Sequence, residues 1–207
     1  PTPTGEMVIA QAQKVLEESS RIQDIADAGK DQLNSPLRVG AIFTIGPYLF
    51  PQFIPKLRQI APNMPLVVEE SYTATLRRRL RNGDLDVIII ALPFTEADVV
   101  TQPLYTEPFV VLLPEQHALA KRKVIKPLDL ENENILMLGE GHCFREHVLE
   151  AVPSLAHPAK HNARGIRTDT EGSSLETMRH MVASGLGITI LPLSAVLGTQ
   201  NRLQNLV

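Results

Sequence analysis

The stretch Leu85-Asp86-Val87-Ile88-Ile89-Ile90-Ala91-Leu92 decides the fold class of this 207-residue chain. Apart from Asp86 it is apolar, and β-branched residues dominate it. A short continuous apolar run of this kind is typical of a strand buried in a parallel sheet. The turn-forming residues Asn82-Gly83-Asp84 come directly before it. We therefore predict a buried strand here, within an α/β fold.

Strands and helices alternate in the residues before this stretch. The mostly apolar residues 37–43 predict a strand, and Thr44 is a possible N-terminal cap for a helix through Leu57. A second strand is expected over residues 64–69 and a second helix over residues 73–81. The order strand, helix, strand, helix, strand is that of a doubly wound unit.

The same alternation restarts after a polar segment around residues 95–102. Strands are expected at residues 109–113, 135–138 and 188–191, and helices at Cys143 and at Ser173 or Ser174. We therefore predict two α/β units in series with a cleft between them. Ligands of such folds bind beyond the carboxyl ends of the strands, which here are the loops at Thr44, Thr73, His142 and Ser173.

Residues 5–29 form the longest helical pattern in the chain. An apolar seam with alternating spacings of four and three runs along it, formed by Val8, Ala12, Val15, Ser19, Ile22 and Ala26. Such a seam predicts pairing with a second copy of the helix. The alternative is an amphipathic helix that packs on its own domain.

Composition restricts the possible functions. The net charge of -3 does not indicate a nucleic-acid-binding chain, and the basic run at residues 76–81 has no interleaved aromatic residues for stacking. No P-loop or dinucleotide motif follows a strand, and the six histidines show no HxxxH or CxxC spacing in a form that suggests a metal site, so we expect no cofactor and no metal. A single cysteine and no apolar run of membrane length favour the cytoplasm, with a processed periplasmic protein as the alternative.

Cys143 is the first candidate for chemistry. It follows an apolar strand and the turn Gly139-Glu140-Gly141, and it begins a predicted helix. The N–H groups at a helix N-terminus favour thiolate over thiol, and His142 and Arg145 add potential positive charge. A thiolate in this position could be oxidised to a sulfenic acid. The alternative is a small buried cysteine that takes part in no reaction.

Three segments resemble the LysR-type transcriptional regulators. Residues 1–6 with the long helix resemble the junction between that family's winged-helix domain and its linker helix. Residues 107–114 resemble the entry to its second subdomain, and residues 184–192 resemble its A-G-x-G-I-x-x-L-P signature. The resemblance covers essentially the whole chain. It implies two Rossmann-like subdomains, similar to periplasmic binding proteins, with a cleft between them and a long linker helix before them.

The resemblance also implies domain boundaries. Residues 1–34 correspond to the end of the winged-helix domain and the linker or dimerisation helix. Residues 35–104 form regulatory subdomain I, which residues 193–207 would complete and which is truncated there. Residues 105–192 form regulatory subdomain II.

Residues 44–51, 141–145 and 174–182 resemble, more specifically, the hydrogen-peroxide-sensing members of this family. The resemblance implies that Cys143 is the redox-active residue, and that the residues binding peroxide around it are Thr44, Thr73, His142 and Arg145. One position departs from the family pattern: those members carry a second, resolving cysteine nine positions after the first, where this chain has Val152.

The function implied is that of a sensor for the oxidative stress response, not of an enzyme. The implied partners are hydrogen peroxide as the signal, further copies of the chain in a dimer or tetramer, promoter DNA through a domain ahead of Pro1, and RNA polymerase in the intact regulator. The main alternative is a regulator domain of the same family that binds a small organic effector in the cleft. A periplasmic solute-binding protein and a peroxidase are further alternatives.

Overall fold

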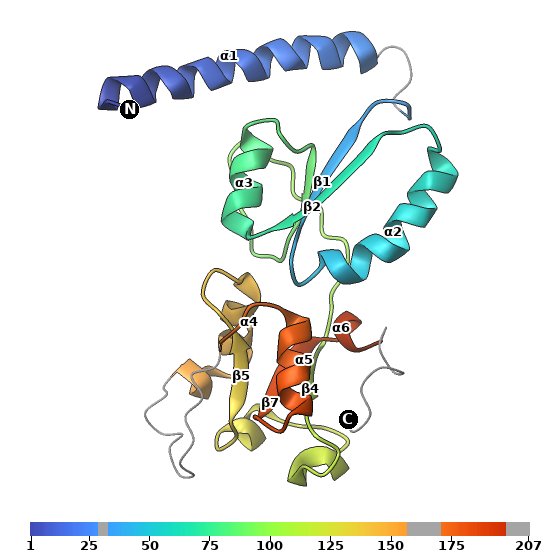
Figure 1. Cartoon of the computed structure of the whole chain (residues 1–207), viewed down its shortest axis with the longest axis vertical. Helices are drawn as coiled ribbons and strands as arrows, with labels where there is room; N and C mark the ends of the chain where they lie inside the picture. The colour runs from blue at the N-terminus through green and yellow to red at the C-terminus, as the bar shows by residue number, and fades with distance from the viewer. Residues whose placement is uncertain (29–32, 157–170, 198–207) are drawn as a thin grey trace. The chain divides into compact units, whose positions relative to one another are not determined.

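A computed structural model of the chain describes residues 1–28, 33–156 and 171–197 (Figure 1). Within it the chain divides into two compact units, Pro1–Ile90 and Ala91–Val207. Among the described helices, none combines the length and the apolarity that crossing a bilayer requires.

The first unit begins with the long helix and continues as a three-stranded parallel sheet with two helices. Its elements are α1 (Pro3–Ala28), β1 (Leu37–Ile42), α2 (Gly46–Ile60), β2 (Leu66–Ser71), α3 (Thr73–Arg81) and β3 (Val87–Ile89). The strand order is β2-β1-β3, and both neighbours run parallel to β1. The α/β alternation expected from the sequence is therefore confirmed in this unit.

The core of the first unit lies between the sheet and α2. Val39 and Ala41 of β1 are buried against Phe50 of α2. The helix α3 lies on the other side of the sheet from α2 (Figure 1), and its Leu76 is completely buried. Helices on both faces are what a parallel sheet requires, because both faces of its strands are apolar.

The seam of α1 is exposed to solvent. Val8, Val15 and Ile22 have exposed fractions of 62%, 61% and 69%. The predicted helix is thus confirmed, and the alternative in which its apolar seam packs on its own domain is wrong for these three side chains.

The second unit carries a four-stranded mixed sheet. Its strands are β4 (Phe109–Leu112), β5 (Ile135–Leu138), β6 (Glu171–Gly172) and β7 (Ile188–Pro192), and its helices are η1 (Ala118–Lys121), η2 (Pro127–Leu130), α4 (Cys143–Ala151), η3 (Pro153–Ala156), α5 (Leu175–Ala183) and α6 (Ser194–Leu197). The strand order is β4-β7-β5-β6. β7 pairs antiparallel with β4 and parallel with β5, so the last strand of the described chain lies in the middle of the sheet.

Three local expectations differ from the structure. Thr44 does not cap a helix, since α2 begins at Gly46 after Ile45 and has no side-chain cap. Pro47 in the first turn of α2 has no backbone N–H, so this turn has one donor fewer for a cap to satisfy. The strand expected over residues 64–69 lies at Leu66–Ser71. The strand expected over residues 85–92 pairs only through Val87–Ile89, at one edge of the described sheet, which leaves Val87 45% exposed.

Candidate functional site

Cys143 is the first residue of α4. The strand β5 ends at Leu138, and the turn that follows reverses at Gly141, whose φ of 89° lies in the left-handed region that favours glycine. The thiol is free and half-buried. The sequence prediction of a cysteine at the start of a helix is therefore confirmed. The sulfur lies at the N-terminal end of the helix, where the backbone N–H groups carry partial positive charge.

His142 precedes α4 and is buried, with 7% of its surface exposed. Its side chain makes no capping hydrogen bond to the first turn of the helix. Burial lowers the pKa of His142, because desolvation penalises the charged imidazolium. The neutral ring is favoured near neutral pH, which differs from the positive charge expected from the sequence. A neutral ring can both donate and accept a hydrogen bond.

Arg145 anchors the first turn of α4 to the strand before it. Its Nη1 donates a hydrogen bond of 3.0 Å to the carbonyl oxygen of Leu138, the last residue of β5. The guanidinium has five N–H donors, so this contact leaves others for further partners. Arg145 therefore combines a positional role with a positive charge two residues from the thiol.

Val152 caps the C-terminal end of α4 and belongs to the core, with 3% of its surface exposed. Nine residues of α-helix at 1.5 Å per residue separate its Cα from that of Cys143 by about 13 Å. A disulfide needs Cα atoms within about 7 Å of each other. A cysteine at position 152 could therefore bond to Cys143 only after α4 had opened.

The two threonines that were predicted to bind peroxide lie in the first unit, each shortly after the end of a strand. Thr44 follows β1 and is 5% exposed, and Thr73 is the first residue of α3, just after β2. The Thr73 Oγ1 is buried without a hydrogen-bond partner in the described structure. An unpaired buried hydroxyl is costly and calls for an explanation such as an absent ligand.

Glu70 lies at the same edge of the sheet and was not identified from the sequence. A Cβ atom added to Gly46 would lie 2.6 Å from Glu70 Oε1, so the carboxylate approaches the first residue of α2 closely. Burial raises the pKa of Glu70. The pair Glu69-Glu70 near the end of an apolar strand was the only sequence signal.

A small cavity lies beside α4, and Phe144 and Arg145 of the first turn of this helix are among the residues that line it. It is lined mainly by apolar side chains of α4, α5, β5 and β7, among them Phe144, Val148 and Met178. Cys143 does not line it. The cavity therefore borders α4 without reaching the thiol.

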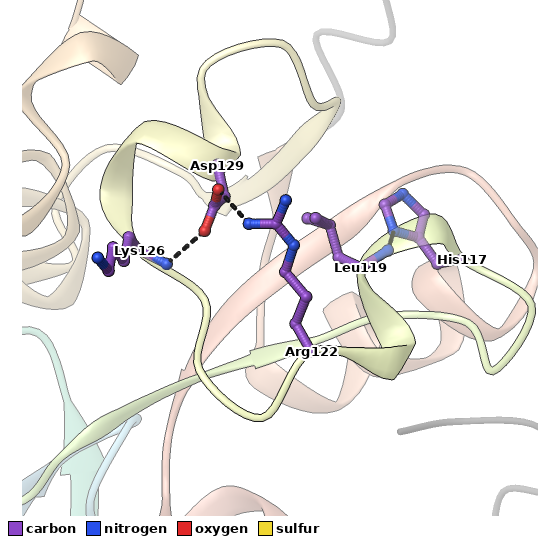
Figure 2. A network of polar contacts seen from close by, with 5 residues as sticks. All are labelled: His117, Leu119, Arg122, Lys126 and Asp129. Atoms are coloured by element: carbon purple, nitrogen blue, oxygen red, sulfur yellow. Dashed lines mark hydrogen bonds and ion pairs between the residues drawn. The ribbon is translucent and has the colours of Figure 1, made fainter.

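A polar network fixes the segment that follows β4 (Figure 2). Arg122 Nη1 lies 2.5 Å from Asp129 Oδ1, and the backbone N–H of Lys126 donates to Asp129 Oδ2 at 2.9 Å. This N–H, and then Arg122, hold the pKa of Asp129 below its usual value. His117 Nδ1 accepts from the Leu119 N–H at 3.2 Å, so His117 is a structural residue.

The predicted site residues thus form two groups. His142, Cys143 and Arg145 are consecutive or nearly so at the start of α4, whereas Thr44 and Thr73 lie at strand ends in the other unit. Over residues 1–28, 33–156 and 171–197, no group of three His, Cys, Asp or Glu side chains is arranged to hold a metal ion. His157 and His161 fall outside the described residues.

The chain matches known proteins over almost its full length. A family model described as LysR substrate binding domain matches residues 30–206. The DNA-binding transcriptional dual regulator OxyR of Escherichia coli strain K12 is 36% identical over 197 residues, which are 94% of this chain and 62% of that protein. The chain thus spans less than two thirds of this relative's length.

Two solved structures are also similar. The reduced form of the OxyR regulatory domain from Pseudomonas aeruginosa is 52% identical with a TM-score of 0.74, covering 85% of this chain and 79% of that one. A Corynebacterium glutamicum OxyR mutant with bound hydrogen peroxide is 29% identical with a TM-score of 0.77, covering 100% of this chain and 63% of that one.

Proposed function

The chain belongs to the LysR substrate binding domain family, and from this premise we propose that it is the sensing domain of a transcriptional regulator that detects hydrogen peroxide by oxidation of Cys143. The regulator would serve the oxidative stress response and would bind promoter DNA through a domain outside these residues. In this proposal the chain undergoes one reaction per signal and is not an enzyme. Further relatives carry the name hydrogen peroxide-inducible genes activator, which supports it.

The placement of Cys143 is the observation that carries the proposal. The thiol is free, half-buried and at the N-terminus of a helix that has no side-chain cap. Partial positive charge from the uncapped first turn then falls on the sulfur. A cysteine with only a packing role needs neither this position nor this access to solvent.

The proposed reaction is a nucleophilic displacement on peroxide. The Cys143 thiolate attacks one oxygen, an S–O bond forms, and the O–O bond breaks. The second oxygen leaves as hydroxide and takes up a proton to become water, and the sulfur is left as a sulfenic acid. Hydrogen-bond donors that stabilise the charge on the leaving oxygen accelerate this step.

Four residues are proposed to bind and polarise the peroxide. The unpaired hydroxyl of Thr73 supports its assignment, since a bound peroxide would supply the missing partner. Thr44 is the equivalent buried hydroxyl at the end of β1. His142, favoured in its neutral form, can donate or accept, and Arg145 supplies positive charge.

Val152 determines what happens after oxidation. The chain has one cysteine, so a sulfenic acid at Cys143 cannot be resolved by a disulfide within these 207 residues. We therefore propose that the oxidised signal is the sulfenic acid itself or a product of its reaction with another thiol. The opening of α4 would not be locked by a bond to position 152.

The proposed partners follow from the same assignment. The exposed apolar seam of α1, with Val8, Val15 and Ile22, supports a homodimer or a tetramer built from dimers. RNA polymerase is proposed as a partner of the intact regulator, in the cytoplasm. These assignments concern the longer protein to which such a domain belongs.

The test is the rate of sulfenic acid formation at Cys143 in low micromolar peroxide, trapped with dimedone and followed by mass spectrometry. We expect labelling much faster than that of the same thiol in the urea-unfolded chain. Equal rates in the folded and unfolded chain would overturn the proposal. That result would favour the alternative, a family member that binds a small organic effector, and Cys143→Ser would then leave regulation intact.

A further inference from the structure

The first turn of α4 is held at an aromatic contact outside the predicted site. The ring of Phe144, the residue after Cys143, packs edge-to-face on the ring of Phe109, with centroids 5.0 Å apart and planes at 66°. This geometry is the attractive arrangement for aromatic pairs. Phe144 is 7% exposed, so its ring is fixed in the core.

The first turns of α4 and α5 differ in their capping. The helix α5 in the same unit begins with a side-chain cap, in which Ser174 Oγ accepts from the Thr177 N–H at 3.1 Å. In contrast, α4 begins after His142 without such a cap. Two of the contacts that fix its first turn are the Arg145 bond to the Leu138 carbonyl and the Phe144 packing.

Phe109 is itself firmly anchored at its backbone. It is the first residue of β4 and pairs with Pro192 of β7 in the antiparallel ladder. On one side of this pair the Leu193 N–H donates to the Pro108 carbonyl at 3.1 Å, and the Ser194 N–H donates to Glu107 Oε1 at 2.6 Å. The Phe109 ring thus gives α4 a fixed point on the sheet.

We propose that Phe109 is a positioning residue for Cys143: through Phe144 its ring holds the first turn of α4 in the helical form that places the thiol at the helix N-terminus. Loss of the ring frays this turn, and the thiol then leaves the partial positive charge of the helix. The same contact couples an opening of α4 to the start of β4.

This inference rests on the proposed function only in taking Cys143 as the reacting group. Its test therefore uses iodoacetamide as the probe and no peroxide. If the chain proved insensitive to peroxide, the alkylation result would still decide whether Phe109 positions the thiol.

The variants are Phe109→Leu and Phe109→Met, which remove the ring, and Phe109→Tyr, which keeps it. Phe109 is 39% exposed, so these changes open no sealed core cavity. Val124→Ala, at a side chain 72% exposed in the same unit, is the control for removal of exposed apolar surface. All are compared in the 207-residue chain.

Two readouts are measured, the hydrogen exchange of amides 147–150, which donate to the carbonyls of residues 143–146, and the alkylation rate of Cys143 as a function of pH. In the Leu and Met variants we expect the protection of these amides against hydrogen exchange to fall by about three- to tenfold. This is the factor by which the free energy of an aromatic pair changes an equilibrium constant. Alkylation should slow near neutral pH and not in strong base, where every thiol is ionised. The Tyr variant should behave as the parent.

Unchanged protection and an unchanged pH dependence in the Leu and Met variants would overturn the inference. So would a Tyr variant as impaired as these two, since the ring would then not be the cause. A general loss of stability would differ from this result in both readouts. The alkylation rate would not change selectively near neutral pH, and the protection of amides against exchange would fall throughout the unit.

Discussion

The guanidinium of Arg145 donates its Nη1–H to the carbonyl oxygen of Leu138 at 3.0 Å, and it thereby ties the first turn of α4 to the strand before it. Leu138 is the last residue of β5 and 3% exposed. Without the guanidinium, the carbonyl oxygen of Leu138 would lose this hydrogen bond at a buried strand end, where water replaces it poorly. The residue expected to polarise peroxide is thus also part of the scaffold of its own helix.

Arg145→Met should therefore reduce both stability and reactivity. It keeps the apolar stem and removes the donor, so we expect the free energy of unfolding to fall by about 1 to 2 kcal/mol. Urea unfolding measures this change, and dimedone trapping measures the slower oxidation of Cys143. Arg122→Met is the matched control, because its ion pair with Asp129 is exposed and should contribute less than about 1 kcal/mol. Equal losses in both variants would contradict the anchoring role.

Thr73→Val should separate function from stability. The Oγ1 of Thr73 is buried and unpaired, so replacing the hydroxyl by a methyl group leaves the free energy of unfolding unchanged or raises it by up to about 1 kcal/mol. The oxidation rate of Cys143 by peroxide should fall by about tenfold to a hundredfold, the effect of losing one donor to a developing charge. Thr75→Val on the same helix is the control and should leave the rate unchanged. A normal rate in Thr73→Val would remove Thr73 from the site.

Protonation of His142 should couple stability to pH. Burial lowers the pKa of His142, so between its lowered value and the ordinary value of about 6.5 the unfolded chain binds more protons than the folded chain. Stability from this residue is therefore present above the ordinary value and is lost as the pH falls through this window. Urea unfolding of the parent and of His142→Asn at neutral and mildly acidic pH measures the difference. The variant should lose less stability on acidification, and identical pH dependences would contradict the prediction.

Val152→Cys should restore an intrachain disulfide. Val152 is 3% exposed, and cysteine is small enough to replace it with little strain. After peroxide has formed the sulfenic acid at Cys143, the new thiol attacks that sulfur and releases water, provided that α4 opens over the intervening distance of about 13 Å. Mass spectrometry under non-reducing conditions detects the bond. In the control Ala151→Cys, on the preceding residue of the helix, the bond should form more slowly. No disulfide in Val152→Cys would mean that oxidation does not open α4.

Charges on the seam of α1 should dissociate the oligomer. Val8 and Val15 are exposed at 62% and 61%, so Val8→Asp with Val15→Asp costs little in the isolated chain but places like charges across a paired seam. We expect a shift from dimer to monomer in sedimentation velocity, with an unchanged circular dichroism spectrum. Gln11→Asp with Gln13→Asp, at positions off the seam, is the control. A parent chain that is already monomeric would remove the pairing proposal.

The sequence alone determined the local elements and the place of the candidate thiol. Apolar periodicity predicted β5 at residues 135–138, and the serine signal predicted the start of α5, where Ser174 caps the helix. Cys143 was expected at a helix start because a strand and a glycine turn precede it, and this is where it lies. These features depend on neighbours within a few residues, which a single sequence records directly.

The tertiary structure decided the contacts that give these residues their roles. The bond from Arg145 to Leu138, the ring of Phe109 beside Phe144 and the unpaired hydroxyl of Thr73 all depend on side-chain directions that periodicity does not encode. The sequence suggested positive charge at His142, and burial there favours the neutral ring. Burial and long-range packing are properties of the assembled core, because residues far apart in the chain create them together. The sequence therefore located the thiol, and the packing around α4 determined what holds it in place.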